Sequence, residues 1–526
     1  MINSIFAVDL VLLNGNIISM SRTVKDAEAV AVRDGRIVKV GKNSDVKRLV
    51  GEKTEVVDLE GKTLIPGFVD THCHPLALGL SLGWVNLRHV GSIEKLKDRV
   101  RKFISNSPRG SWIQGFGWDQ DRFKEKRFPT RWDLDEVSED NPIILTRYCG
   151  HISVVNSKAL EIAGVTKDTD PPEGGVIEKD PVTGEPTGLL KEGAVELVKA
   201  KIPKLKMEEL CTAVERACSK AVSTGITTLH WITESAEEIE ALQRVYHQKG
   251  LPLRVRVLVP EKLTPHLIGL GLRSNFGDSF LRIGAVKLFV DGSLGARTAA
   301  LEEPYSDDPS TRGVMVHTPE ELRRIVSEVD RAGLQVAMHA IGDRAIREAL
   351  NALSETLGSD IRRDHRHRLE HVTVLNKTLL ERMVKLNVFV TIQPHFVVSD
   401  FWAPDRVGPS RSRFLNAYKS LLKSGLRVSC GSDCPVEPID PLIGIEAAVA
   451  REVNPEERLT VDEALEMYTL NGAYASFEED EFGSIEEGKL ADMTVLSDDP
   501  RKVPPSEIGK ISVEMTIVDG RIVYNP

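Results

Sequence analysis

The sequence has no run of 18 or more apolar residues, few cysteines and no excess of positive charge. Without such a run, no segment is expected to cross a membrane as a helix. Asp and Glu total 78 against 68 Lys and Arg, a net charge of −10. This balance argues against nucleic-acid binding, which needs a basic surface to neutralise phosphates. The six cysteines form no CxxC pair, so we expect a reduced, cytoplasmic protein.

The two ends of the chain carry the same short motif. DGRIV occurs at 34–38 and again at 519–523. Asp-Gly between alternating apolar residues predicts a hairpin with a type I′ turn. The first twenty residues also alternate, and they lack the cationic region of a signal peptide. Because neither end alone has enough strands to bury a sheet face, we expect one discontinuous β-sandwich domain built from residues 1–63 and 482–526.

The interior alternates short apolar runs with amphipathic segments. Continuous apolar strands followed by helices are typical of a parallel sheet that is covered on both faces. Eight such units predict an α/β fold with a (β/α)8 TIM-like barrel over residues 64–481. The strand candidates are Leu64–Asp70, Ile226–Trp231, Leu253–Val259, Ile283–Val290, Leu334–His339, Arg368–Val372, Val388–Gln393 and Arg427–Gly431.

The first interval of this pattern is unusually long. From His74 to Ile226 the chain contains far more residues than one helix and its turns require, including strand-like runs of its own. We therefore expect residues 80–210 to be an insertion. Because it leaves the barrel directly after His74, it should emerge at the face where barrel active sites lie and form a lid there.

Ionisable side chains stand at the ends of several strand candidates. His72 and His74 are two residues apart, a spacing that turns both side chains to the same side of a strand. A single histidine at a strand end is more often an ordinary polar group, but a cluster of ionisable groups is typical of a functional site. Imidazoles and carboxylates are the ligands that Zn²⁺ prefers. The converging residues are His72, His74, Lys287, His339, His371 and Asp433.

With these residues the chain resembles the amidohydrolase superfamily, and within it the amidohydrolase-3 group of YtcJ-like metal-dependent hydrolases. The resemblance runs nearly end to end, and the order and spacing of the motifs are more specific than any one of them. It implies a metal-bearing barrel flanked by a β-sandwich from both termini. The motifs are PGFVDTHCH (66–74), GHISVVNSKAL (150–160), VKLFVDGSLGARTAAL (286–301), MHAIGD (338–343), LEHV (369–372), QPHF (393–396), GSDCPVEP (431–438) and GSIEEGKLADMTVL (483–496).

The resemblance also implies roles for the individual ligands. His72 and His74 correspond to ligands of the more buried metal, and His339 and His371 to ligands of a second one. Asp433 corresponds to a ligand of the buried metal and to the general acid and base of the reaction. The cofactor expected is therefore one or two divalent ions, with Zn²⁺ as the expected metal.

Lys287 corresponds to a lysine that related binuclear members carry as a carbamate derived from carbon dioxide, which bridges two ions. An ammonium could not serve there, because it has three donors and no acceptor. The alternative is a single-metal enzyme in which Lys287 pairs with Asp291 or another carboxylate.

Four further residues are candidates for substrate binding. His151 lies in the inserted segment, and His395 ends the seventh strand candidate. His230 ends the second candidate, where similar sequences often have Asp, so its role is open. Arg297 could clamp a substrate carboxylate. For each of the histidines the alternative is a structural role, and for Arg297 it is an ordinary salt bridge.

These observations favour a hydrolase that cleaves a C–N bond of amide, N-acyl or N-formyl type, using metal-activated water and Asp433 as proton shuttle. A deaminase or an isomerase on the same scaffold is the alternative, although Lys287 argues against a mononuclear deaminase. A non-catalytic assembly protein of the same fold is a third reading, disfavoured because every ligand position is filled. The expected partner is a small-molecule substrate, without nucleic acid or membrane, and a homo-oligomer stays open.

Overall fold

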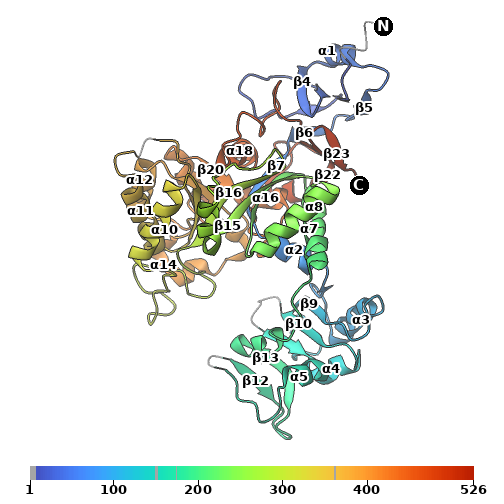
Figure 1. The fold of residues 1–526 in the computed structure, drawn as a ribbon, viewed down its shortest axis with the longest axis vertical. Helices are drawn as coiled ribbons and strands as arrows, with labels where there is room; N and C mark the ends of the chain where they lie inside the picture. The colour runs from blue at the N-terminus through green and yellow to red at the C-terminus, as the bar shows by residue number, and fades with distance from the viewer. Residues whose placement is uncertain (1–6, 148–151, 173–174, 361–362) are drawn as a thin grey trace. The chain divides into compact units, whose positions relative to one another are not determined.

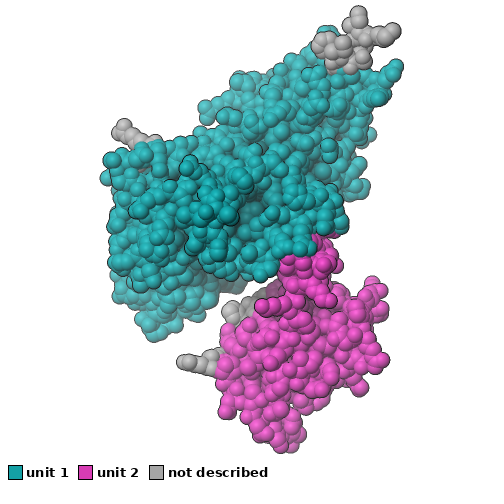
Figure 2. All heavy atoms as spheres, in the orientation of Figure 1, with its two compact units in different colours: residues 1–75, 218–526 teal, residues 76–217 magenta. Residues whose placement is uncertain are grey.

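The computed structural model describes residues 7–147, 152–172, 175–360 and 363–526. These residues form four β-sheets and divide into two compact units, shown in different colours in Figure 2. The first unit contains Met1–Pro75 and Cys218–Pro526, and the second contains Leu76–Ala217. Among the described residues, no helix combines the length and the apolar character needed to span a bilayer.

Eight parallel strands form the central sheet of the first unit, and their order in the sheet follows their order in the chain. Figure 1 labels four of them, β7, β15, β16 and β20. The Thr71 hydroxyl donates to the Cys430 carbonyl, so the last strand lies beside the first. The sheet is thus a nearly closed TIM-like barrel, which confirms the predicted fold class at this level. The strands are β7 (Phe68–Cys73), β14 (Ile226–Ile232), β15 (Arg254–Pro260), β16 (Leu281–Phe289), β17 (Gln335–Ala340), β18 (Arg368–His371), β19 (Phe389–Ile392) and β20 (Val428–Cys430).

The helix α10 (Pro319–Arg331) shows how the sequence specifies the elements around the barrel. Thr318 caps its first turn and Glu321 completes a capping box. The chain turns out of the helix at Gly333, whose φ is 73°, a value that glycine adopts without steric cost. The other helices of this part are α8 (Ala236–Lys249), α9 (Thr264–Gly269), α11 (Asp343–Leu357), α12 (Lys377–Lys385), α13 (Phe396–Ser399), α14 (Ala403–Ser412), α15 (Tyr418–Lys423), α16 (Pro441–Ala450), α17 (Val461–Met467) and α18 (Leu470–Ala475).

The structure divides the first strand candidate between two sheets. Leu64–Asp70 contains parts of two strands: β6 (Thr63–Pro66) pairs with β21 (Met493–Leu496) in another sheet, and only Phe68 begins the barrel. Gly67 lies between them, where a Cβ atom would come within 2.2 Å of the Thr227 side chain. The apolar run is continuous through this glycine, so the local pattern does not reveal the change of sheet.

Two smaller sheets contain the chain ends, and both predicted hairpins are confirmed. Asp34 and Gly35 have φ values of 51° and 73°, and Asp519 and Gly520 have 54° and 72°, as a type I′ turn requires. The four-stranded sheet contains β1 (Leu10–Leu13), β3 (Ala29–Arg33), β4 (Arg36–Gly41) and β5 (Glu55–Asp58), and the helix α1 (Asn43–Val46) follows β4. The five-stranded sheet contains β2 (Asn16–Ile17), β6, β21, β22 (Val513–Val518) and β23 (Arg521–Tyr524).

These two sheets share one hydrophobic cluster. Leu12 and Val30 of the first sheet belong to it together with Met493 and Ile517 of the second. Both sheets fall in the same compact unit as the barrel. A separate sandwich domain with the bounds 1–63 and 482–526 therefore stays a prediction.

The second unit, Leu76–Ala217, has a six-stranded sheet and a hydrophobic core of its own, in which Trp118 and Phe123 are fully buried. Its strands are β8 (Val85–Asn86), β9 (Ile113–Trp118), β10 (Ile143–Arg147), β11 (Ile152–Val155), β12 (Val176–Lys179) and β13 (Pro186–Lys191). Helices α2 (Pro75–Ser81) and α7 (Met207–Val222) extend across its limits, and α3 (Ile93–Ile104), α4 (Arg131–Asp135), α5 (Ser157–Ala163) and α6 (Glu196–Lys199) lie inside them. Its role as a lid stays a prediction.

A buried histidine before β18 predicts a pH-dependent stability. The Nε2 of His365 donates to the Leu386 carbonyl and its Nδ1 accepts from the His367 N–H, and the second bond requires a neutral ring. Burial lowers the pKa of His365 from 6.5 to about 4. Between these values the unfolded chain binds more protons than the folded one, so stability falls as the pH is lowered through this window.

We expect this histidine to contribute a loss of about 2 kcal/mol in the free energy of unfolding between pH 7 and pH 5. The loss should be absent in His365→Gln and present in His266→Gln, which changes an exposed histidine. Chemical denaturation at both pH values measures it. An unchanged pH dependence in His365→Gln would contradict the assignment.

Candidate metal centre

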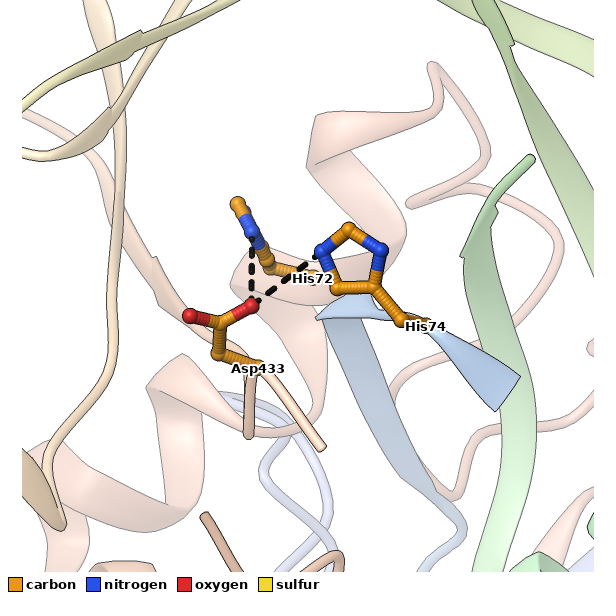
Figure 3. A group of neighbouring side chains, drawn as sticks. All are labelled: His72, His74 and Asp433. Carbon is orange, nitrogen blue, oxygen red and sulfur yellow. Dashed lines mark ion pairs between the residues drawn. The ribbon is translucent and has the colours of Figure 1, made fainter. Parts of the chain in front are cut away.

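His72, His74 and Asp433 converge where the first and last barrel strands meet (Figure 3). His72 lies near the end of β7, His74 follows that strand, and Asp433 lies in the loop after β20. The Nε2 atoms of both histidines are 3.3 Å from Oδ1 of Asp433. One ligand atom from each residue lies within 4.8 Å of the other two. Two imidazoles and a carboxylate at this spacing fit the donor set of Zn²⁺.

A buried aspartate holds the loop of Asp433 against β7. The Asp70 carboxylate accepts the backbone N–H of both His72 and Ser432 and the hydroxyl of Ser432. The Asp433 N–H in turn donates to the His72 carbonyl over 2.7 Å. Burial raises the pKa of Asp70 to about 6. Asp70 therefore connects the two segments that carry the three donors.

The remaining predicted ligands lie next to this group. The ring of His371 is 4.8 Å from that of His72 and 4.4 Å from that of His339, measured between centroids. The Nζ of Lys287 is 3.5 Å from Nε2 of His72. His371 and Asp433 have positive φ values of 73° and 58°, a backbone conformation that is uncommon outside glycine and clusters at functional sites.

Burial sets the charge states of several of these side chains. Burial lowers the pKa of His339 to about 3 and that of His371 well below its usual value, so both rings are neutral near pH 7. His339 Nε2 lies 3.0 Å from the Gly292 carbonyl, which leaves Nδ1 as its donor atom for a metal. Burial also lowers the pKa of Lys287 to about 8. Burial opposes the charge on Asp433, but the close contacts of His72 and His74 with its Oδ1 outweigh burial and lower the pKa of Asp433.

Two charged residues of β18, Arg368 and Glu370, lie next to the proposed ligands, and the sequence interpretation did not include them. Glu370 contacts Nδ1 of His72 over 2.5 Å and accepts from Nε of Arg368 over 2.5 Å. Both are fully buried. A signal was present in the RLEH motif, because charges two residues apart on a buried strand turn to the same side and must be paired there.

Residues 55–524 match the model of the amidohydrolase family. The chain belongs to the amidohydrolase family. It is 36% identical to the putative amidohydrolase YtcJ of Bacillus subtilis, over 97% of this chain and 98% of that protein. It is 30% identical to an N-substituted formamide deformylase of Arthrobacter pascens, over 98% of each chain. The crystal structure of an uncharacterized metal-dependent hydrolase from Pyrococcus furiosus superposes with a TM-score of 0.80 at 36% identity, covering 94% of this chain and 100% of that one.

Three of the four predicted substrate-binding residues of this amidohydrolase lie in the described part of the chain, and each contacts a different partner. His230 is 2% exposed and contacts Nη1 of Arg368 beneath the centre, so it is part of the buried network. Arg297 forms an exposed ion pair with Asp307, which was the alternative reading for this residue. His395 contacts Glu437. His151 lies outside the described residues.

A cleft opens beside two of the predicted ligands. It has a volume of about 400 Å³, and His74, Lys287 and Phe289 line it together with residues of the loops after β14 and β15. The cleft that His395 lines is a different one, between α13 and α16. The cleft at His74 has a size suited to a small molecule.

Proposed function

We propose that this amidohydrolase is a metal-dependent hydrolase that cleaves a C–N bond in a small amide, N-acyl or N-formyl compound. The observation that carries the proposal is the convergence of His72, His74 and Asp433 at the end of the barrel where active sites lie. These residues would hold a divalent ion, expected to be Zn²⁺, which would lower the pKa of water and polarise a carbonyl. The similarity to a formamide deformylase supports the bond type.

Asp433 is the group that moves the proton. Its pKa is lowered, so it is a carboxylate near pH 7 and can accept a proton from the attacking water. The water oxygen bonds to the carbonyl carbon, and the proton passes through Asp433 to the leaving nitrogen as the C–N bond breaks. The products are a carboxylic acid and an amine. Oδ1 of this carboxylate lies 3.3 Å from Nε2 of both histidines, so the three proposed ligand atoms face one point.

Lys287 is proposed to carry a carbamate. The neutral amine attacks the carbon of carbon dioxide and loses one proton, and the product offers two acceptor oxygens where an ammonium offers only donors. Its surroundings support this. Lys287 is 2% exposed, and among the described residues no carboxylate oxygen lies within 4.0 Å of its Nζ. Asp291, the partner considered in the alternative, instead accepts backbone N–H groups of Ala300, Ile341 and Gly342.

Metal content is the first test of the proposal. Protein purified without chelator should contain one or two equivalents of Zn²⁺ by elemental analysis, and His72→Ala and His74→Ala should each lose most of it because each removes a ligand. His247→Ala, on the surface of α8, is the matched control and should keep it. A screen of N-acyl and N-formyl compounds then identifies the substrate class. A metal-free sample with full activity would overturn the proposal.

A further inference from the structure

The proposed reaction gives no role to Arg368 and Glu370, the two buried charged residues next to the proposed metal ligands. We propose that Glu370, oriented by Arg368, is a positioning residue that places the proton of His72 on Nδ1 and thereby leaves the lone pair of Nε2 for the metal. This inference rests on the proposed function, since it concerns one of the proposed ligands. An Arg368–Glu370 pair that only stabilised the fold would not determine which nitrogen of His72 carries the proton.

The contacts of Glu370 are divided between its two oxygens. Oε2 lies 2.5 Å from Nδ1 of His72, and Oε1 accepts from Nε of Arg368 over 2.5 Å. All three side chains are at most 1% exposed, so water does not compete for these bonds. The opposite ring nitrogen, Nε2, is the one that faces Asp433 and Lys287.

Arg368 orients the Glu370 carboxylate and is itself held by two further contacts. Its guanidinium also contacts Nδ1 of His230 over 2.8 Å and donates to the Thr71 carbonyl. A guanidinium can only donate hydrogen bonds, so every group that it contacts must accept. Glu370 must therefore present an acceptor to Arg368 with one oxygen, and as a carboxylate it presents a second acceptor to His72 with the other.

The donors and acceptors around Glu370 also predict how Glu370→Gln would change the protonation of His72. The introduced amide has one acceptor and one donor group, and Arg368 requires the acceptor. The amide NH₂ would then face Nδ1 of His72, which could only accept from it, and the ring proton would move to Nε2. Carboxylate partners of metal-bound histidines fix the tautomer in this way, and their loss typically costs 10- to 100-fold in metal affinity.

A second substitution should reverse the effect. In Glu370→Gln/Arg368→Gln the residue at 368 has an amide oxygen that can accept from the NH₂ at 370. The oxygen at 370 is then able to turn to His72 and accept from Nδ1–H again. The double variant should therefore bind metal more tightly than Glu370→Gln alone, although it has lost more of the buried network.

The matched control is another buried arginine–glutamate pair, formed by Arg256 of β15 and by Glu478, which follows α18. Glu478 accepts from Nε and Nη2 of Arg256 over 2.5 and 2.8 Å, and both side chains are buried. Glu478 does not contact a proposed ligand among the described residues. Glu478→Gln should therefore lower the thermal stability as Glu370→Gln does but leave the affinity for metal unchanged.

The experiment measures Zn²⁺ affinity by competition with a chromophoric chelator, together with thermal unfolding, for the wild-type protein and the three variants. We expect a 10- to 100-fold loss of affinity in Glu370→Gln, a recovery in the double variant and no loss in Glu478→Gln. Equal affinities in Glu370→Gln and wild type, equal losses in both single variants, or a double variant no better than Glu370→Gln would each overturn the inference. A wild-type protein that binds no Zn²⁺ would overturn the proposed function instead.

A measurement on the wild-type protein keeps the inference testable if Glu370→Gln does not fold. In the Co²⁺-loaded protein, the Nδ1–H of His72 should give a strongly shifted proton resonance that exchanges slowly with solvent because it is buried against Glu370. His72→Ala assigns the resonance by its absence. If His72 in the loaded protein had no proton on Nδ1, Glu370 would not have the proposed role.

Discussion

Asp433→Asn is expected to lower kcat by about 1,000-fold while most of the metal stays bound. The magnitude is that of a lost general acid and base, since an amide can neither accept the proton of water nor return it to the leaving nitrogen. Its oxygen can still face His72 and His74, which now contact Oδ1. Steady-state kinetics and elemental analysis of the same preparation separate the two effects.

Asp343→Asn is the control for this substitution. Asp343 is also a buried aspartate of the barrel, and its carboxylate accepts the backbone N–H of Glu302 and Arg344 without contacting a proposed ligand. Its replacement should leave kcat near the wild-type value. If Asp433→Asn kept a near-wild-type kcat with its metal in place, Asp433 would not be the proton shuttle.

Lys287→Ala is expected to lose part of the bound metal and to lower kcat/KM by about 100-fold or more. This loss corresponds to about 2.7 kcal/mol, within the several kcal/mol that a metal supplies to a developing negative charge. Elemental analysis gives the metal content. Addition of a short carboxylic acid such as propionate should restore activity in part, because its two oxygens replace those of the carbamate in the space that the side chain vacates.

Lys287→Met provides the comparison for the rescue. Its side chain fills the same space without oxygens, so propionate should not restore its activity. Mass spectrometry or electron density at the lysine tip tests the modification directly. An unmodified amine in fully metallated protein prepared with bicarbonate would exclude the carbamate and favour the single-metal alternative.

The sequence predicts those parts of the fold that depend on local patterns. The buried runs of β14 and β17 and the Asp-Gly turns at Asp34 and Asp519 are readable because burial and positive φ leave a signature within a few residues. The change of sheet at Gly67 is not readable, since the apolar pattern of one sheet continues into the next. Only the strands with which they pair, β21 for β6 and β14 for β7, distinguish the two.

The same limit applies to the site. The strand ends predict that His72, His74 and Asp433 lie close together, because parallel strands in one barrel bring their carboxyl ends to one face. Arg297 could not be placed in this way, because its partner Asp307 lies in the loop that follows and not on a strand. The position of His230 beneath the centre depends on Arg368, which belongs to a distant strand.

The position of the centre at the junction of β7 and β20 has a consequence for how the protein matures. Asp70 and Ser432, which contact each other, lie 362 residues apart in the chain, so His72 is synthesised well before Asp433. An ion bound at the proposed site would therefore meet all three donors only after the last barrel strand has closed on the first. Loading with metal would then be a late step that reports completion of the barrel, and a bound ion would stabilise the closed barrel by holding β7 and the loop after β20 together.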